Sequence, residues 1–202
     1  MEPEITPEDK QKIGQGIREK YAKVAVSPQG LFRYPTGRAG LEALRYDPEI
    51  LKTIPAGAVD SFCGVGNPFQ LGPVGEGETL LDIGSGGGLD CLVAARMVGP
   101  EGKVVGLDLS PEMISRAKEN LQASGLTNVT FLEWSGGTLP FPENSFDLVI
   151  SNGVINLVPD KQKVLREIAR VLKPGGRLMM ADQILIGEGP KDPQARIASW
   201  FR

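Results

Sequence analysis

The sequence contains no histidine among its 202 residues and only two cysteines, Cys63 and Cys91. The absence of histidine excludes a Ser-His or Cys-His nucleophile pair, a histidine general base and a zinc site with an imidazole ligand. The cysteines lie in separate contexts without paired spacing, so we expect no disulfide framework and a reducing, cytoplasmic setting. Any chemistry of this chain has to use other groups.

Long apolar runs and a strong charge imbalance are also absent. No segment reaches the roughly 18 consecutive apolar residues that a membrane-spanning helix needs. Residues 1–14, MEPEITPEDKQKIG, are acidic and polar, which is unlike a signal peptide. A net charge of −3 disfavours broad binding to nucleic acid or to an anionic membrane surface. We therefore expect a small ligand as partner, and the oligomeric state stays open.

From residue 79 onward the sequence alternates between apolar strands and helices. Strands are predicted at residues 79–84, 103–110, 128–134, 146–153 and 175–184, and helices at residues 89–98, 110–125 and 160–173. Uniformly apolar strands separated by helices predict an α/β fold, with a doubly wound, mostly parallel sheet that is covered by helices on both faces. The stretch Lys173-Pro174-Gly175-Gly176 is predicted to stop a helix and turn the chain.

The N-terminal part has a different composition. Residues 7–27 predict a helix, because apolar side chains recur there at helical spacing, and short helices are predicted near residues 40–44 and 48–53. Residues 55–72 are rich in glycine and proline and predict irregular backbone. We therefore expect a helical and irregular cap over residues 1–75 and the α/β core over residues 76–202.

Residues 80–90, LLDIGSGGGLD, place four glycines in five positions directly after the first predicted strand. Such a cluster indicates either a flexible turn or a backbone that a ligand approaches closely. In an open parallel sheet, ligands bind beyond the carboxyl ends of the strands where the strand order reverses, and this loop lies there. Asp108 ends the second strand 24 residues after Gly84, a spacing at which a carboxylate can accept hydrogen bonds from a ribose.

The loop does not follow the dinucleotide fingerprint. That pattern needs a glycine at its sixth position, which Leu89 occupies here, and it has no place for Asp82. Acid-x-Gly-x-Gly-x-Gly instead resembles the motif of class I methyltransferases that use S-adenosylmethionine. Segments LPFPENSFDLVISN and VLREIARVLKPGGRLMMAD resemble later parts of that superfamily, so the resemblance covers roughly residues 70–186. A nicotinamide site and a purely structural turn are the alternatives.

The resemblance implies a Rossmann-like enzyme with S-adenosylmethionine as cofactor and S-adenosylhomocysteine as product. It also implies a seven-stranded sheet, whose last two strands this chain is expected to lack. We predict that the cofactor contacts Asp82, Gly84, Ser85, Gly86, Gly88, Asp108, Leu109, Met113, Ser135, Gly136, Ser151 and Asn152. Ser135 stands where the superfamily often has an acid for the adenine amino group, and the backbone N–H of Gly136 is a further donor. Trp134 covers the adenine or packs in the core.

Three segments carry a closer resemblance, to arsenite methyltransferases, over nearly all of residues 40–186. They are SFCGVGNPFQLG, DIGSGGGLDCLVAARMVGPEGKVVGLDLSPEM and SNGVINLVPDKQKVLREIARVLKPGG. In that family, cysteine thiolates hold As(III), whose lone pair attacks the methyl group, and soft thiolates suit a soft metalloid. Val65 and Gly153 stand at two of the family's cysteine positions, so the trithiol pattern is missing. Cys91 is expected to be a buried, inert thiol, and Cys63 either contacts the acceptor or packs.

The acceptor is expected to be a small molecule or a metalloid. Candidate residues around it are Tyr21, Cys63, Asn67, Asn152 and Asn156. Tyr21 either closes over the sulfonium by a cation–π contact or packs in the core. No catalytic base and no metal site are assigned. The first hypothesis is a methyltransferase, the second is a cofactor-binding relative without catalysis, and the third is a nicotinamide oxidoreductase.

The last residues are Trp200-Phe201-Arg202. In the family that the chain resembles, a cysteine follows three residues after this tryptophan. One hypothesis is that the reading frame continues through a selenocysteine codon read as a stop, and the alternative is a trimmed chain or a true truncation. Without further strands, the fifth strand would form an edge of the sheet.

Overall fold

The computed structural model describes residues 6–184 together with residues 186, 192, 195 and 200. Its centre is a five-stranded sheet with the order β3-β2-β1-β4-β5, and every pairing is parallel. The strands are β1 (Thr79–Ile83), β2 (Lys103–Asp108), β3 (Val129–Glu133), β4 (Phe146–Asn152) and β5 (Leu172–Ala181). The strand order reverses at β1, because β2 and β4 flank it on opposite sides. This confirms the doubly wound fold.

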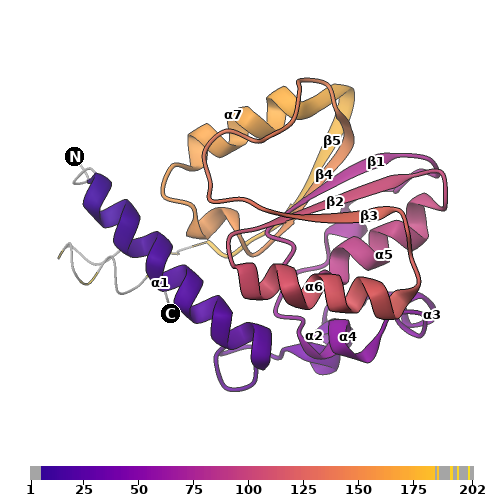
Figure 1. The fold of residues 1–202 in the computed structure, drawn as a ribbon, viewed down its shortest axis with the longest axis horizontal. Helices are drawn as coiled ribbons and strands as arrows, with labels where there is room; N and C mark the ends of the chain where they lie inside the picture. The colour runs from indigo at the N-terminus through magenta and orange to yellow at the C-terminus, as the bar shows by residue number, and fades with distance from the viewer. Residues whose placement is uncertain (1–5, 185, 187–191, 193–194, 196–199, 201–202) are drawn as a thin grey trace.

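Helices cover both faces of the sheet. Helices α5 (Leu89–Val98) and α6 (Pro111–Ser124) lie on one face, and α7 (Lys161–Val171) lies on the other, as Figure 1 shows. Each face buries its own apolar cluster: Leu80, Leu92 and Phe131 belong to the α5 side, and Leu81, Leu107 and Ile168 belong to the α7 side. Burial of these aliphatic strands on both faces is what fixes a parallel sheet in this sequence.

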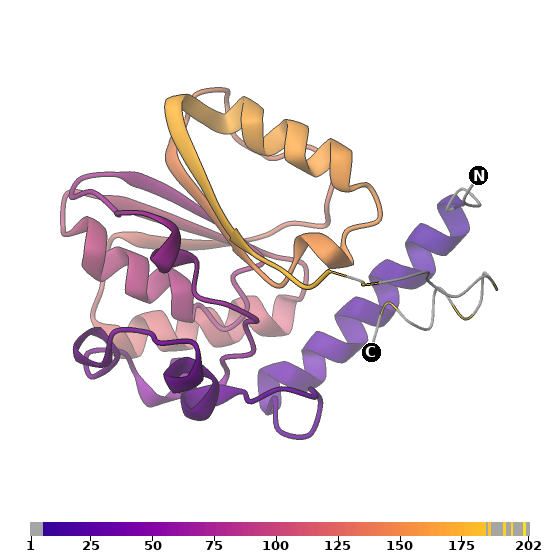
Figure 2. The same ribbon diagram turned by 180° about the vertical axis from the view of Figure 1, so that it is seen from behind.

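The N-terminal part forms four helices on the α5–α6 side: α1 (Pro7–Val26), α2 (Gly37–Ala43), α3 (Pro48–Leu51) and α4 (Ala56–Asp60). Helix α1 begins at a capping box, in which Thr6 and Asp9 satisfy each other's backbone donors. It contacts α6 and extends past the edge of the core, which Figure 2 shows from behind. Short 3-10 helices, η1 (Pro68–Leu71) and η2 (Ile155–Leu157), complete the elements of the described residues.

One local expectation was wrong and another was right in part. Residues Ala56–Asp60 form α4 within a segment that was expected to be irregular. Helix α7 ends at Val171 just before Lys173–Gly176, as expected, but this stretch lies within the bounds of β5, which begins at Leu172. The pairing with β4 passes from Leu172 directly to Arg177, and Gly175 has φ +79°. The Pro-Gly-Gly sequence therefore forms an irregularity inside β5 instead of a separate turn.

Within the part of the chain that the structure describes, the outer strands β3 and β5 form the two edges of the sheet. Leu178 and Met180 on β5 are partly exposed along that edge. None of the helices in the described part of the chain is long and apolar enough to cross a membrane. Phe201 and Arg202, at which the expectation about the chain end was aimed, lie outside the described residues.

Candidate functional site

A cavity of about 650 Å³ opens beyond the carboxyl ends of β1, β2 and β4. The glycine loop forms its floor, and α1 forms one wall. The segment from Gly153 to Val164 and the segment from Trp134 to Gly137 close the other sides. The volume is within the range of ligand pockets in proteins, and its position is where open parallel sheets bind ligands.

The glycine loop is held against the neighbouring strand by its own backbone. The N–H groups of Gly84 and Ser85 donate to the carbonyl oxygen of Leu107, at 2.7 and 2.8 Å. Gly84 has φ +80°, and a β carbon at this position would overlap the side chain of Val154. The turn therefore needs glycine at residue 84 for its conformation and for its close neighbour.

Asp108 joins the loop to the end of β2. Its Oδ2 accepts from the Gly86 N–H at 2.8 Å, and its Oδ1 accepts from the Ser110 N–H at 2.9 Å. Burial raises the pKa of the Asp108 carboxyl, while these backbone donors act to lower it. The Leu109 backbone also hydrogen-bonds to this carboxyl. An ionised carboxylate has about four acceptor positions, so about one stays available for a ligand hydroxyl.

Two features of the loop fit a nucleoside ligand. The hydroxyl of Ser85 is buried at the cavity wall and has no hydrogen-bond partner among the described residues. A β carbon built on Gly86 would have no heavy atom of the described residues within 4 Å, so this backbone is open to the cavity. A buried hydroxyl without a partner is costly, and a bound polar ligand can supply one. The exposed backbone of Gly86, the hydroxyl of Ser85 and the carboxylate of Asp108 thus lie together at the cavity wall.

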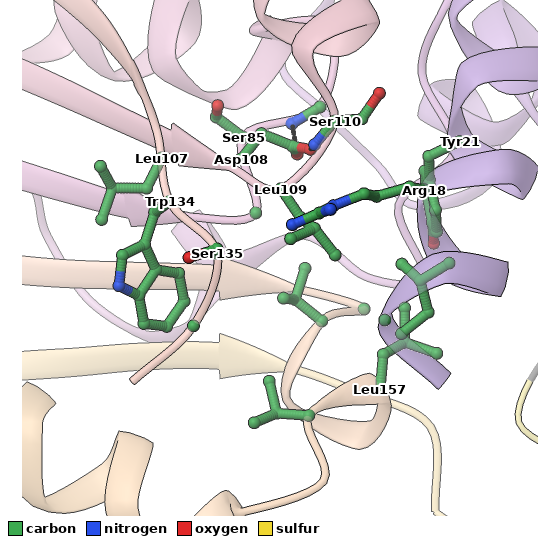
Figure 3. Close-up of a pocket in the computed structure, with 18 of the residues that line it drawn as sticks. Arg18, Tyr21, Ser85, Leu107, Asp108, Leu109, Ser110, Trp134, Ser135 and Leu157 are labelled. Atoms are coloured by element: carbon green, nitrogen blue, oxygen red, sulfur yellow. Dashed lines mark hydrogen bonds between the residues drawn. The ribbon is translucent and has the colours of Figure 1, made fainter. Parts of the chain in front are cut away.

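The segment after β3 forms the side of the cavity that was predicted for the adenine. Trp134 donates its backbone N–H to the carbonyl oxygen of Asp108 at 2.8 Å and its indole N–H to that of Thr138 at 3.2 Å. It lines the cavity and also packs against the α7-side core, so both alternatives for this residue describe part of its surroundings. Gly136 also lines the cavity, as does Ser135, which Figure 3 shows beside Trp134.

The structure separates the predicted cofactor residues into two groups. Gly84, Ser85, Gly86, Asp108, Leu109, Ser135, Gly136 and Asn152 line the cavity, whereas Asp82, Gly88, Met113 and Ser151 are not part of the wall that the described residues form. Asp82 is buried and accepts a hydrogen bond from the Cys91 thiol at 3.2 Å. Ser151 donates its hydroxyl proton to the carbonyl oxygen of Ile83 at 3.1 Å. The side chains of Asp82 and Ser151 therefore form hydrogen bonds within the protein and do not face the cavity.

Asn152 uses its side chain to hold a distant loop. Its Oδ1 accepts from the N–H groups of Val65 and Gly66 at 2.9 and 3.0 Å. Its Nδ2 donates to the Gly66 carbonyl oxygen at 2.8 Å and to Asp90 Oδ2 at 3.0 Å. The side chain thus fixes the loop before η1 to the end of β4, and its predicted contact with cofactor or acceptor stays a prediction.

Besides Asn152, two predicted acceptor residues, Tyr21 and Cys63, lie at the cavity. Tyr34 donates its hydroxyl proton to the Cys63 carbonyl oxygen at 2.9 Å, which positions this backbone. Burial raises the pKa of the Cys63 thiol to about 12 and raises that of Tyr21 well above its usual range. Since the thiolate is the metal-binding and nucleophilic form, Cys63 is a protonated thiol at neutral pH and a poor ligand.

The other two acceptor candidates do not line the cavity. Asn67 caps η1 by accepting from the Phe69 N–H at 3.1 Å, and it donates to the Arg45 carbonyl oxygen. Asn156 lies within η2 and donates its backbone N–H to Asp182 at 2.9 Å. Among the described residues, no group of three or more histidine, cysteine or acidic side chains could hold a metal ion.

The sequence analysis assigned no role to two residues of the cavity wall, Arg18 and Asp90. Figure 3 shows the Arg18 side chain reaching from α1 toward Leu109 and Ser135. The one feature of the sequence that could have indicated Arg18 is its position one helical turn before Tyr21, which places both on the same side of the predicted helix. Asp90 lies in the first turn of α5, where an acid is ordinarily explained by the helix dipole, so the pattern gave no reason to place it at a site.

These features are those of the cofactor-binding fold of class I S-adenosylmethionine-dependent methyltransferases. A family model described as "Methyltransferase domain" matches residues 75–200, and the chain belongs to this family. The chain is 39% identical, over an alignment of 204 positions, to an arsenite methyltransferase of Halobacterium salinarum. That alignment covers 94% of this chain but 52% of the relative, so the chain spans about half the length of the protein it matches.

Solved structures support the fold. A SAM-dependent methyltransferase from Aquifex aeolicus matches with a TM-score of 0.55 at 28% identity, covering 80% of this chain and 81% of that one. An arsenic(III) S-adenosylmethionine methyltransferase from Chlamydomonas reinhardtii matches with a TM-score of 0.54 at 36% identity. That match covers 74% of this chain and 50% of the other. The cofactor that the family implies is S-adenosylmethionine.

Proposed function

We propose that this protein transfers the methyl group of S-adenosylmethionine to a small-molecule or metalloid acceptor at the cavity. The observation that carries the proposal is the joint placement of the Gly86 backbone and the Asp108 carboxylate at one cavity wall. Asp108 would accept from the ribose hydroxyls, the Gly84–Gly86 backbone would face the homocysteine part, and Leu109 with Trp134 would enclose the adenine.

S-adenosylmethionine supplies an electrophilic methyl group on a sulfonium sulfur. The contribution of the protein is to orient the two reactants and to exclude water, and such positioning can supply about 7–11 kcal/mol of the barrier. Tyr21 on α1 and Gly153 on the loop after β4 both line the cavity and would border the acceptor. We assign no catalytic base.

A second function, cofactor binding without methyl transfer, is favoured by one observation. Val65 and Gly153, which stand where the arsenite methyltransferases that the chain resembles have cysteines, give this place an apolar surface. The thiol of Cys63 is held protonated by burial, because its pKa is raised to about 12. A thiolate-held metalloid therefore lacks ligands among the described residues, which supports binding of the cofactor without methyl transfer to arsenic.

The experiment is methyl transfer from labelled S-adenosylmethionine to a panel of acceptors that includes arsenite with thiols. Transfer to any acceptor supports the first function. Tight binding of S-adenosylhomocysteine without transfer to any member of the panel supports the second. Binding of NAD instead of either adenosyl ligand would contradict both and would support a nicotinamide enzyme.

Three coarser expectations stay proposals of their own. Residues 1–75 would act as a cap and residues 76–202 as the core that holds the cofactor. The cysteine content supports a cytoplasmic location, and the net charge of −3 supports the absence of nucleic-acid contacts. Proteolysis that separates the two segments, together with localisation of the tagged protein, tests the first two.

A further inference from the structure

Asp90 is a buried carboxylate at the wall of the cavity, and only 7% of the residue is exposed. Its Oδ1 accepts from the Tyr46 hydroxyl at 2.7 Å, and its Oδ2 accepts from the Asn152 amide at 3.0 Å. Both donors are neutral, and no ion pair in the described part of the chain involves Asp90. A buried carboxylate is costly to keep ionised without a cation.

The other groups that face Asp90 do not supply a cation. Asp82 on β1 and the thiols of Cys63 and Cys91 interact with it electrostatically, and Tyr46 has a pKa raised well above its usual range by burial. All of these groups are neutral or acidic. Burial raises the pKa of Asp90 to about 6, so at pH 7 the group is mainly ionised.

The position of Asp90 in the fold indicates which part of a ligand it meets. Asp108 ends β2, and Asn152, the partner of Asp90, ends β4. Since β1 lies between β2 and β4, the two carboxylates lie on opposite sides of the glycine loop that follows β1. A ligand whose ribose meets Asp108 extends across this loop toward Asp90 with its other end.

We infer that Asp90 binds the α-ammonium group of the homocysteine part of the cofactor, held for this purpose by Tyr46 and Asn152. The inference rests on the proposed function, since it assumes an adenosyl ligand with its ribose at Asp108. The ammonium supplies the cation that the protein lacks at this carboxylate. Asp108 then selects the nucleoside, and Asp90 selects the amino acid attached to it.

The test compares two ligands that differ by this amino-acid part. S-adenosylhomocysteine carries the ammonium group, and 5′-methylthioadenosine has the same nucleoside and a thioether without it. Titration calorimetry at pH 7.5 should show that Asp90→Asn weakens S-adenosylhomocysteine binding about 10- to 100-fold and leaves 5′-methylthioadenosine binding within about twofold, as expected for loss of a hydrogen bond to a charged group. Equal weakening of both ligands, or no change, would overturn the inference.

Asp160 provides a matched control. It lines the same cavity and caps α7 by accepting from the Lys163 N–H at 3.0 Å, a role that asparagine can also fill. Asp160→Asn should therefore affect neither ligand selectively. If Asp160→Asn weakens the binding of S-adenosylhomocysteine as strongly as Asp90→Asn does, general loss of negative charge explains the result and the inference fails.

The unmodified protein allows a second test if Asp90→Asn does not fold. Protonation of Asp90 removes its charge, so the ratio of the affinities for S-adenosylhomocysteine and 5′-methylthioadenosine should fall about tenfold between pH 7.5 and pH 5, given a pKa of about 6. A ratio independent of pH would contradict the inference. Failure of the unmodified protein to bind either ligand would instead contradict the proposed function.

Discussion

Val65 and Gly153 lie against each other, although they are far apart in the sequence. The Val65 N–H donates to Oδ1 of Asn152, the residue before Gly153 and 87 positions from Val65. A β carbon built on Gly153 would be 3.3 and 3.4 Å from the two γ carbons of Val65. The structure therefore brings together two positions at which the resemblance to arsenite methyltransferases implies cysteines. An apolar contact occupies the place where two thiols would meet.

This contact predicts that two cysteines can create an arsenic site. In a Cys63→Ser background, Val65→Cys with Gly153→Cys should bind one equivalent of phenylarsine oxide under reducing conditions. Its affinity should exceed that of either single variant by at least about 100-fold, because the second thiol binds within the same molecule. Titration monitored by tryptophan fluorescence measures this affinity.

The cysteine at residue 153 has a structural cost that the control has to include. Gly153 has φ +75°, a conformation that costs a non-glycine residue about 1–2 kcal/mol. Circular dichroism should therefore show that the double variant stays folded, with lower thermal stability. A folded double variant that binds no better than the single variants would refute the proximity of the two positions.

Gly84→Ala should damage the glycine loop beyond a simple conformational penalty. The β carbon would overlap Val154, and φ is +80°. Gly125 is a matched control, because its φ is +68° in the left-handed α region and no heavy atom of the described residues lies near its β-carbon position. Gly125→Ala should cost about 1–2 kcal/mol in urea unfolding. Gly84→Ala should cost more and should also weaken cofactor binding, and equal costs without a binding defect would argue against the close packing.

Asp108 should act on the nucleoside rather than on the amino acid. Asp108→Ala should abolish binding of both S-adenosylhomocysteine and 5′-methylthioadenosine, because it removes the ribose acceptor and leaves the N–H groups of Gly86 and Ser110 without their partner. Asp108→Asn keeps the shape of the side chain and should weaken the binding of both ligands by a similar factor. Calorimetry that finds either ligand unaffected would place the ribose elsewhere.

Asp90 should also give stability a measurable pH dependence. Its pKa is about 6 in the folded protein and 3.8 ordinarily, so the folded state binds more protons between these values. The stability contributed by this group is therefore fully present below about pH 3.8 and is lost as pH rises through about 6. Thermal unfolding should show Asp90→Asn gaining stability relative to the unmodified protein from pH 4 to pH 7. A difference that does not change with pH would contradict a buried, ionised Asp90.

The sequence predicted the sheet well because its signals are local. Apolar strands followed by glycines or capped helices fixed β1, α5 and α6 to within one or two residues, and Ser110 caps α6 as its sequence indicates. The stretch Lys173–Gly176 ends α7 as its sequence indicates, but β5 is paired with β4 on both sides of it, a long-range effect that a proline-glycine pattern does not record. Helix α4 was missed for a similar reason, since it packs against α6 and α2.

The candidate site was predictable where spacing determines position. Gly84 and Asp108 come to one wall because both follow neighbouring parallel strands. Asp90 was not predictable, since its partners Tyr46 and Asn152 lie 44 and 62 residues away. Asp82 matched the motif, yet its side chain bonds to the Cys91 thiol inside the protein. A motif identifies which residues recur, whereas the direction of each side chain depends on packing.

The most direct test of the central claim is a crystal structure of the protein with S-adenosylhomocysteine. The account predicts density on the Gly84–Gly86 backbone, with both ribose hydroxyls within hydrogen-bond distance of the Asp108 carboxylate and the adenine beside Leu109. A ligand bound away from this loop, or a ribose without contact to Asp108, would contradict it.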